Sequence, residues 1–343
     1  MKIGIANDLP LVLEALRQTL TRDGLHEVVW MARDGEEAVR RCAVQTPDLI
    51  LMDLLMPTMD GAEAIRRIMA HTPCPILVVT SSIDNNAPMV FEAMGAGALD
   101  AIDTPIVDGS SVDSGVDLLL DKITMIGRLT SKSLTLPKPS AVTPGTGSSL
   151  HQGLVVIGAS SGGPQALADI LGRLGEDFAA PIVIIQHVDR KFVSALAKWL
   201  STMTKLPINL ARHGTPPQAG NVYLACTNDH LVINFEGCFS YTKYPGDLVY
   251  RPSVDVFFNS IVEYWRGPVI GVLLTGMGND GAEGLLNLRQ HGWHTITQDK
   301  QSSAVFGMPK AAASLQAATE ILPLADIGPR LERLLRVDEV AIR

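Results

Sequence analysis

The sequence contains little cysteine and no hydrophobic run long enough to cross a bilayer. Its four cysteines, Cys42, Cys74, Cys226 and Cys238, form no Cys-x-x-Cys pair, which argues against a structural zinc site and a disulfide framework. No apolar stretch approaches the roughly 20 residues of a transmembrane helix. The start of the chain also lacks the apolar core of a secretory signal peptide. We therefore expect a cytoplasmic protein that does not insert into a membrane.

Basic residues are too few to indicate a nucleic-acid-binding protein. Lysine and arginine total 28 against 36 acidic residues, and the formal net charge is −8. Acidic residues outnumber basic ones by 19 to 9 in residues 1–122, whereas the rest of the chain is nearly balanced. A chain of 343 residues is long for one domain, so two domains are expected, in a monomer by default.

A segment of low complexity divides the chain. Residues 131–149 read SKSLTLPKPSAVTPGTGSS, in which Ser, Thr, Pro and Gly fill 13 of 19 positions. This composition cannot build a core and is typical of a linker. We therefore predict a first domain over residues 1–122, a flexible linker over 123–150 and a second domain over 151–343.

Apolar strands alternate with amphipathic helices in the first domain. The predicted strands are KIGIA, HEVVWMA, DLILMD, PILVVTSS and ALDAID. Helices are expected between them, two of which begin with an acidic capping pair, Asp34 with Glu37 and Asp60 with Glu63. This alternation predicts a parallel sheet covered by helices, in which ligands bind at the carboxyl ends of the strands.

The second domain combines the same alternation with a different segment. GLVVIGA, PIVIIQH, PVIGVLLTG and HTITQD are further buried-strand candidates. Residues 221–243, NVYLACTNDHLVINFEGCFSYTK, alternate between apolar and polar and are broken by Asn-Asp and Glu-Gly, which predicts antiparallel hairpins. A last helix is predicted over residues 329–337, with Pro329 in its first turn. The fold class is therefore α/β, with an antiparallel insertion in the second domain.

Two aspartates follow strands of the first domain. Asp8 follows the first strand, Asp53 ends the third, and Thr80 closes the fourth. Each aspartate alone is most simply a helix cap or a solvated turn residue. Together at one sheet edge, two carboxylates and nearby carbonyls form an oxygen-rich site that suits Mg²⁺.

The string LMDLLMPTMDG and its surroundings resemble the response-regulator receiver domain, a five-stranded flavodoxin-like fold. The resemblance implies that Asp53 accepts a phosphoryl group from a histidine kinase. It implies that Asp8, Asp53 and the Leu55 carbonyl bind Mg²⁺ and that Thr80 is the switch hydroxyl. Asn7 replaces one acidic residue of the family pattern, and Thr104 replaces its lysine. We therefore expect phosphorylation with altered Mg²⁺ dependence or switching.

The turn GASSGGP, residues 158–164, has two interpretations. It is similar to the glycine loop of short-chain dehydrogenases, but Pro164 stands at the position of the third glycine, and the chain has no Tyr-x-x-x-Lys pair. It also fits Gly-x-Ser-x-Gly, which places Ser160 on a turn between a strand and a helix. A serine at such a turn is most simply an N-cap, so the nucleophile interpretation requires a base.

His187 and Asp280 are the candidate partners of Ser160. His187 ends the run PIVIIQH, and Asp280 follows another buried strand in LLTGMGNDG. A histidine at a strand end and an aspartate in a turn are each more often structural. Three strand ends that carry Ser, His and Asp at one sheet edge indicate a nucleophile, a base and an orienting acid.

Five strings together resemble the CheB family of protein-glutamate methylesterases: VVIGASSGGPQAL, IIQHVD, RPSVDVFF, LLTGMGNDGA and VFGMPKAA. The resemblance assigns Ser160, His187 and Asp280 to a catalytic triad on a doubly wound α/β domain. It assigns the Met277 N–H, together with Ser161, to the oxyanion hole and Arg251 to the substrate cleft. MKIGIANDLPLVLEALR, with Asn7 and Thr104, looks most like the Wsp-type subgroup, which is tied to surface sensing.

The resemblance implies hydrolysis of glutamate methyl esters on chemoreceptor-type proteins, with release of methanol, and deamidation of glutamines. It further implies that a CheA-type kinase phosphorylates the receiver, which otherwise covers the active site. No metal is expected in the esterase step. A non-catalytic adaptor that acts only by docking, and a dehydrogenase, are the alternative functions. Methanol release and NADH titration would distinguish them.

Overall fold

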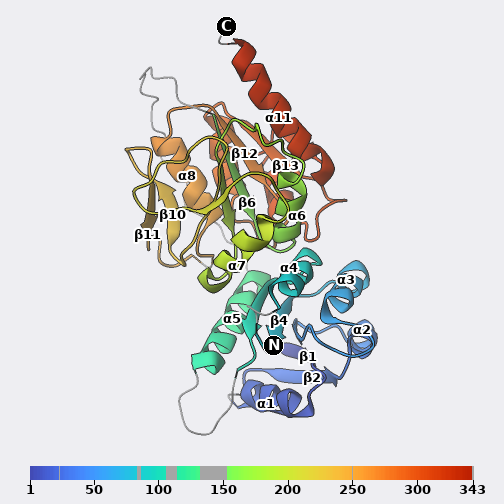
Figure 1. Cartoon of the computed structure of the whole chain (residues 1–343). Helices are drawn as coiled ribbons and strands as arrows, with labels where there is room; N and C mark the ends of the chain where they lie inside the picture. Colours follow the sequence, from blue (N-terminus) through green and yellow to red (C-terminus); the bar gives the residue numbers. More distant parts are fainter. Residues whose placement is uncertain (23, 83–85, 106–113, 132–152, 249, 342–343) are drawn as a thin grey trace.

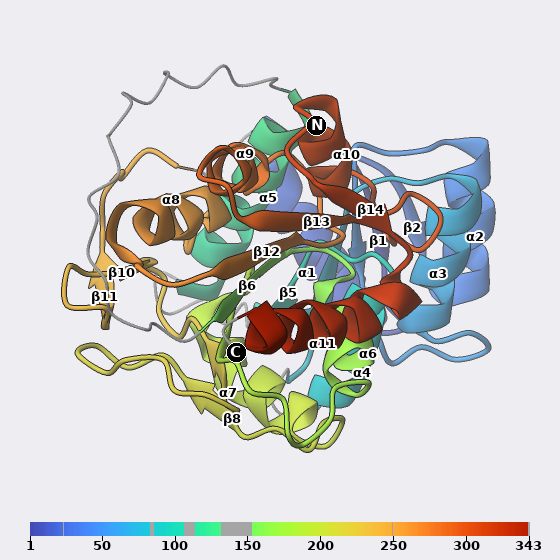
Figure 2. The ribbon, with the colours of Figure 1, turned by 90° about the horizontal axis from the view of Figure 1, so that it is seen from above.

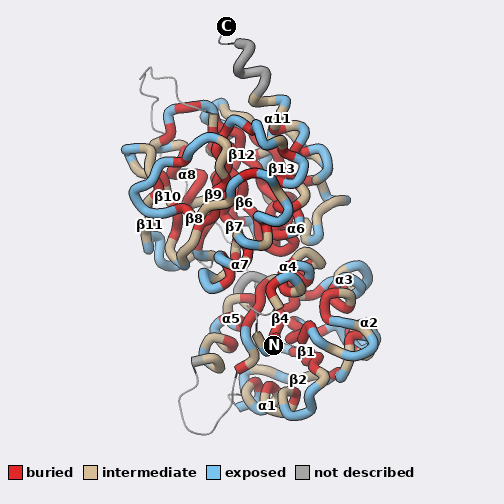
Figure 3. Tube along the Cα trace, in the orientation of Figure 1, coloured by how far each residue is buried: buried red, intermediate tan, exposed pale blue. Residues whose placement is uncertain are grey.

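The computed structural model describes residues 1–22, 24–82, 86–105, 114–131, 153–248 and 250–341. It forms two α/β units that pack against each other, with the N-terminal unit below and the C-terminal unit above in Figure 1. Both units have buried sheets between exposed helical faces (Figure 3). Within the described ranges, no helix combines the length and hydrophobicity that a membrane span requires.

The N-terminal unit contains a parallel sheet in the order β2-β1-β3-β4-β5. All five predicted strands are present: β1 Lys2–Ala6, β2 Glu27–Ala32, β3 Leu49–Met52, β4 Ile76–Thr80 and β5 Asp100–Asp103. Every residue of β3 and β4 is buried, because helices cover both faces of the sheet. The order places the ends of β1, β3 and β4 side by side.

Five helices surround this sheet: α1 Pro10–Thr21, α2 Gly35–Val44, α3 Gly61–His71, α4 Ala87–Gly95 and α5 Ser114–Ser131. The predicted caps are confirmed, since the carboxylates of Asp34 and Asp60 accept from the N–H groups of Glu37 and Glu63. The predicted linker start at residue 123 is wrong, because α5 continues to Ser131. Leu119, Ile123 and Ile126 are buried on one face of α5. The packing of Ile123 and Ile126 stabilises the helix beyond the predicted boundary. The rest of the predicted linker lies outside the described residues.

The C-terminal unit contains a seven-stranded parallel sheet in the order β14-β13-β12-β6-β7-β9-β8. Its strands are β6 Leu154–Ala159, β7 Ile182–Gln186, β8 Ile208–Leu210, β9 Val222–Leu224, β12 Val269–Leu273, β13 His294–Gln298 and β14 Glu320–Leu322. The four predicted buried strands are β6, β7, β12 and β13. In the view from above, α11 and α6 lie on one side of this sheet and α8 and α9 on the other (Figure 2).

The predicted antiparallel segment is only partly antiparallel. β10 His230–Ile233 and β11 Phe239–Thr242 form the expected hairpin. β9, in contrast, is a parallel strand between β7 and β8. Its three residues are all buried, so apolar burial between two strands outweighs the alternation that suggested a hairpin.

The helices of this unit are α6 Gly163–Leu171, α7 Arg190–Leu200, α8 Val254–Tyr264, α9 Ala282–Gln290, α10 Met308–Ser314 and α11 Leu324–Ala341. The prediction that α11 begins at Pro329 is wrong, because the helix starts at Leu324 and contains the proline. Ile327 and Leu331 are both fully buried. Their packing stabilises the turn before Pro329 despite the hydrogen bond that proline removes.

The two units share an apolar interface at α4. α4 of the first unit packs against α6 and α7 of the second, as Figure 1 shows. The Phe91 and Trp199 rings lie 5.5 Å apart between centroids. The Gly162 N–H, in the turn before α6, donates to the Met94 carbonyl at 2.7 Å. The N-terminal unit therefore contacts the turn that carries the candidate nucleophile.

Candidate active site

Three adjacent strands bring the predicted triad to one edge of the second sheet. Ser160 directly follows β6, His187 directly follows β7, and Asp280 lies in the loop after β12. Since β12, β6 and β7 are neighbours in this order, the strand that precedes Ser160 lies between the strands that precede Asp280 and His187. The structure thus places the three residues together, with His187 one strand away from Ser160 as expected.

His187 and Asp280 form a direct pair. The Nε2 atom of His187 lies 2.8 Å from Oδ2 of Asp280, and both side chains are buried. Because a carboxylate only accepts hydrogen bonds, Nε2 carries the proton and Nδ1 remains the basic nitrogen. Nδ1 is buried and bonds to no described residue. It is the nitrogen available to take a proton.

The N-terminus of α8 holds the Asp280 carboxylate. Oδ1 accepts from the Ser253 hydroxyl at 2.7 Å and from the Asp255 N–H at 3.1 Å, and Oδ2 accepts from the Val254 N–H at 2.7 Å. Burial alone raises the pKa of Asp280, but the hydrogen bonds from His187, Ser253 and Val254 outweigh it and lower the pKa. Asp280 is therefore an ionised, rigid partner for His187.

The glycines of the nucleophile turn permit close packing. Gly162 has a φ of +79°, which is favourable only for glycine. A Cβ at Gly163 would lie 2.1 Å from Oε1 of Gln186. Pro164 occupies the first turn of α6, as predicted. The backbone conformation at Gly162 and the close packing at Gly163 explain why glycine is required at these positions. Binding of a dinucleotide is not needed to explain them.

Two turns beside Ser160 carry the predicted oxyanion-hole residues. Ser161 follows the candidate nucleophile and is fully buried. Met277 lies in the loop before Asp280, and Ser161 and Met277 both line the same cavity as Ser160. Among the described residues, no hydrogen-bond partner is found for the N–H of either residue. Two free N–H groups beside a serine can stabilise an oxyanion.

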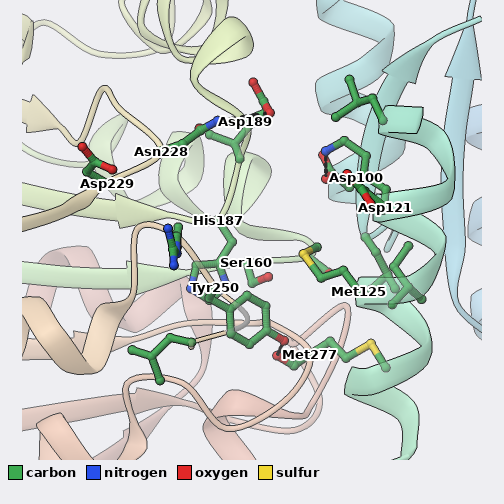
Figure 4. A pocket seen from close by; sticks show the side chains of 18 of the residues that line it. Asp100, Asp121, Met125, Ser160, His187, Asp189, Asn228, Asp229, Tyr250 and Met277 are labelled. Atoms are coloured by element: carbon green, nitrogen blue, oxygen red, sulfur yellow. Dashed lines mark hydrogen bonds and ion pairs between the residues drawn. The ribbon is translucent and has the colours of Figure 1, made fainter. Parts of the chain in front are cut away.

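The candidate site opens into a cavity of about 540 Å³ between the two units. Ser160, His187, Tyr250 and Met277 lie on one wall, and the helix α5 faces them from the other unit (Figure 4). Arg251, the predicted cleft residue, also lines the cavity. Asp100, Asp121, Lys122 and Met125 contribute the N-terminal wall. The N-terminal unit thus covers the candidate active site.

Sequence reasoning missed two residues that support the site. Ser253 holds Asp280, and Tyr250 stacks on the His187 ring. Both lie in or beside RPSVD, which the sequence analysis singled out only for Arg251. The capping position of Ser253 before an apolar helix was the available signal for it.

The predicted phosphorylation residues meet at the carboxyl edge of the first sheet. Asp53 is buried after β3, and the Asn7 amide donates to its Oδ2 at 2.8 Å. The N–H groups of Leu54 and Leu55 donate to Oδ1 at 2.7 and 3.4 Å. Thr80, at the end of β4, accepts from the Asn86 amide at 3.1 Å. Asn86 precedes α4, so the predicted switch hydroxyl contacts the helix of the interface.

The residues around Asp53 are chemically suited to Mg²⁺. Burial, together with the nearby charge of Asp8, raises the pKa of Asp53 to about 6, although the Leu54 and Leu55 N–H groups lower it. A divalent cation would offset the repulsion between these carboxylates. No group of three His, Cys, Asp or Glu side chains suited to a metal occurs in the described part of the chain. This agrees with the replacement of an acidic residue by Asn7, and Mg²⁺ commonly uses one or two carboxylates.

Comparisons with known proteins agree on both units. Residues 155–331 match the family model "CheB methylesterase", and residues 3–111 match "Response regulator receiver domain". A protein-glutamate methylesterase/protein-glutamine glutaminase of Cupriavidus metallidurans is 56% identical, covering 96% of this chain and 97% of its own. A similarly named protein of Burkholderia thailandensis is 52% identical, covering 98% of each chain. The crystal structure of the Thermotoga maritima CheB methylesterase catalytic domain is 34% identical. It covers 54% of this chain and all of that one, with a TM-score of 0.52.

Proposed function

This chain belongs to the CheB methylesterase family, and we propose that it is a serine hydrolase that removes methyl groups from glutamate side chains of chemoreceptor-type proteins. The observation that carries the proposal is the buried His187–Asp280 pair beside Ser160 in a cavity that admits a side chain. The same site would deamidate glutamine, because an ester and an amide pass through similar tetrahedral intermediates. The protein relatives named above support both activities.

The proposed reaction has two steps. The Ser160 oxygen attacks the ester carbonyl while Nδ1 of His187 takes its proton. N–H groups at Ser161 and Met277 stabilise the oxyanion, and the intermediate collapses as the carbon–methoxy bond breaks. His187 returns the proton to the leaving group, which departs as methanol. Water then attacks the acyl carbon while His187 takes its proton, and His187 passes that proton to the Ser160 oxygen as the acyl–oxygen bond breaks. The products are free Ser160 and a glutamic acid side chain, which ionises in solvent to the carboxylate.

Methanol release tests this proposal. The protein is mixed with membranes that contain a methylated receptor, and methanol is quantified beside a Ser160→Ala variant. We expect release from the wild type only. A folded wild type that releases no methanol from a verified substrate would favour the alternative of a non-catalytic adaptor.

We further propose that the receiver restrains the esterase. α5 walls the cavity and α4 contacts the nucleophile turn, so substrate and receiver compete for the same space. Phosphorylation of Asp53 by a CheA-type kinase would weaken this contact through Thr80, Asn86 and α4. The receptor, the kinase, the cytoplasmic location and the Wsp-type placement stay predictions.

Removing residues 1–146 is expected to increase methanol release by roughly 5- to 150-fold, the factor that corresponds to a typical coupling free energy between sites. A full-length variant tests the same contact. A Cβ at Gly95 would lie 2.9 Å from the Gln165 Cβ, so Gly95→Leu should also open the interface and raise activity. Ala43→Leu, on the exposed face of α2, is the matched control. Equal activity of truncated, Gly95→Leu and intact proteins would contradict the restraint.

Asp53 is expected to become labelled by acetyl phosphate in the presence of Mg²⁺. Asp8, Asp53 and the Leu55 carbonyl would hold the ion, which neutralises negative charge as the phosphoryl group transfers. Asp53→Asn and chelation with EDTA should each abolish the label. Asn7→Asp should lower the Mg²⁺ concentration for half-maximal labelling, because it adds a carboxylate. Label that survives in Asp53→Asn would refute the assignment.

A further inference from the structure

Tyr250 contacts both groups that the proposed reaction requires beside Ser160. Its ring stacks on the His187 imidazole, with centroids 4.0 Å apart and planes inclined by 11°. Its hydroxyl donates to the Met277 carbonyl at 2.9 Å. One side chain therefore joins the candidate base to the candidate oxyanion turn, as Figure 4 shows.

The stacking by Tyr250 restricts a motion of the His187 imidazole that Asp280 leaves free. The bond from Nε2 to Asp280 anchors one edge of the His187 ring but leaves the ring free to tilt about that edge. A parallel aromatic ring against the imidazole face removes this tilt. Nδ1, which bonds to no described residue, is thereby held in one direction.

The hydroxyl fixes the peptide that joins Met277 to Gly278. Gly278 has a φ of +82°, and a Cβ there would lie 2.7 Å from the Tyr250 hydroxyl oxygen. Only glycine therefore allows this close approach. Burial, and then the charge of Asp280, raise the pKa of Tyr250, so the phenol stays a donor. Its hydrogen bond restrains the residue whose N–H is the proposed oxyanion donor.

We propose that Tyr250 is a positioning residue that fixes the orientation of the His187 ring and of the Met277 turn relative to Ser160. This inference rests on the proposed function, since it assigns roles relative to that reaction. The ring and the hydroxyl act on different groups, so their contributions can be separated by substitution.

Tyr250→Phe and Tyr250→Leu separate the two contributions. We expect Phe to lower kcat by about 10-fold and Leu by about 100-fold, with KM within about 2-fold of the wild type, in the range of lost positioning and general-base contacts. Circular dichroism and thermal melting check the fold. If the Leu variant does not fold, Tyr250→Met replaces it, because methionine fills the volume without an aromatic face.

Labelling of Ser160 by a fluorophosphonate provides a readout that needs no receptor. The labelling rate should fall in the same order, wild type above Phe above Leu. If the wild type is labelled but releases no methanol, the proposed substrate is refuted. The labelling rates of the three proteins then still test the positioning role of Tyr250. Equal rates in all three proteins, or a change confined to KM, would overturn the positioning role. A wild type inert in both assays would overturn the function and this inference together.

Discussion

Ser160→Ala is expected to lower kcat for methanol release by at least about 10⁴-fold, since a triad without its nucleophile retains only binding and oxyanion stabilisation. The loss should fall on kcat, because the serine oxygen forms the bond to the substrate carbon. The cavity walls stay intact, and KM should change little. Methanol production from methylated receptor membranes measures both parameters.

Two other serines make this experiment specific. Ser161 is adjacent and buried, so Ser161→Ala tests whether the neighbouring hydroxyl is the nucleophile instead. We expect it to retain most activity, because only its backbone N–H enters the proposed reaction. Ser201→Ala, on the exposed end of α7, controls for the loss of any hydroxyl. Abolished release in Ser161→Ala with normal release in Ser160→Ala would reverse the assignment.

Asp280→Asn is expected to lower kcat by about 10³- to 10⁴-fold, as an amide disrupts a histidine tautomer. Each carboxylate oxygen accepts two hydrogen bonds, so an NH₂ group fits neither position. An NH₂ group in place of Oδ2 would point its hydrogens at the Val254 N–H, which is also a donor, and would force His187 Nε2 to accept a hydrogen bond. Nδ1 then carries the proton and cannot act as a base. At Oδ1 it opposes the Asp255 N–H.

Asp255→Asn is the matched control for this change. Asp255 is a partly buried neighbour whose pKa is raised well above its usual range by desolvation and by the charge of Asp280. Asparagine resembles its protonated form, so only a small part of the activity should be lost. Comparable losses in both variants would show a general effect of buried amides and refute the specific role of Asp280.

The central strands of both sheets could be predicted because they are buried on both faces, whereas the short, partly exposed strands Ile208–Leu210 and Glu320–Leu322 were missed. Continuous apolar runs such as residues 154–159 and 182–186 need no information from the rest of the chain, and each was confirmed. The error at Val222–Leu224 arose where a short strand pairs in parallel with distant residues. Local alternation does not reveal that partner. The start of α11 was missed because the burial of Ile327 and Leu331 outweighs the local effect of Pro329.

The candidate triad was accessible for a related reason. Ser160 and His187 directly follow parallel strands and Asp280 lies in the loop after a third, so all three could be assigned to the carboxyl edge of the sheet from their positions. Tyr250 and Ser253 could not, since they follow no strand of the sheet. The loop before α8 brings them to the site through tertiary contacts. The wall formed by α5 likewise depends on how two domains pack.

α4 links the predicted switch residue Thr80 to the turn that carries the candidate nucleophile. It begins beside Asn86, which bonds to Thr80, and near its other end the Met94 carbonyl binds the Gly162 N–H. A coupling free energy between two sites is reciprocal. If phosphorylation of Asp53 favours the open arrangement, a receptor bound at Ser160 favours phosphorylation by the same factor. The methylated receptor would then increase the phosphorylated fraction of the enzyme that demethylates it. Binding of substrate at Ser160 would thus shift the phosphorylation equilibrium at Asp53.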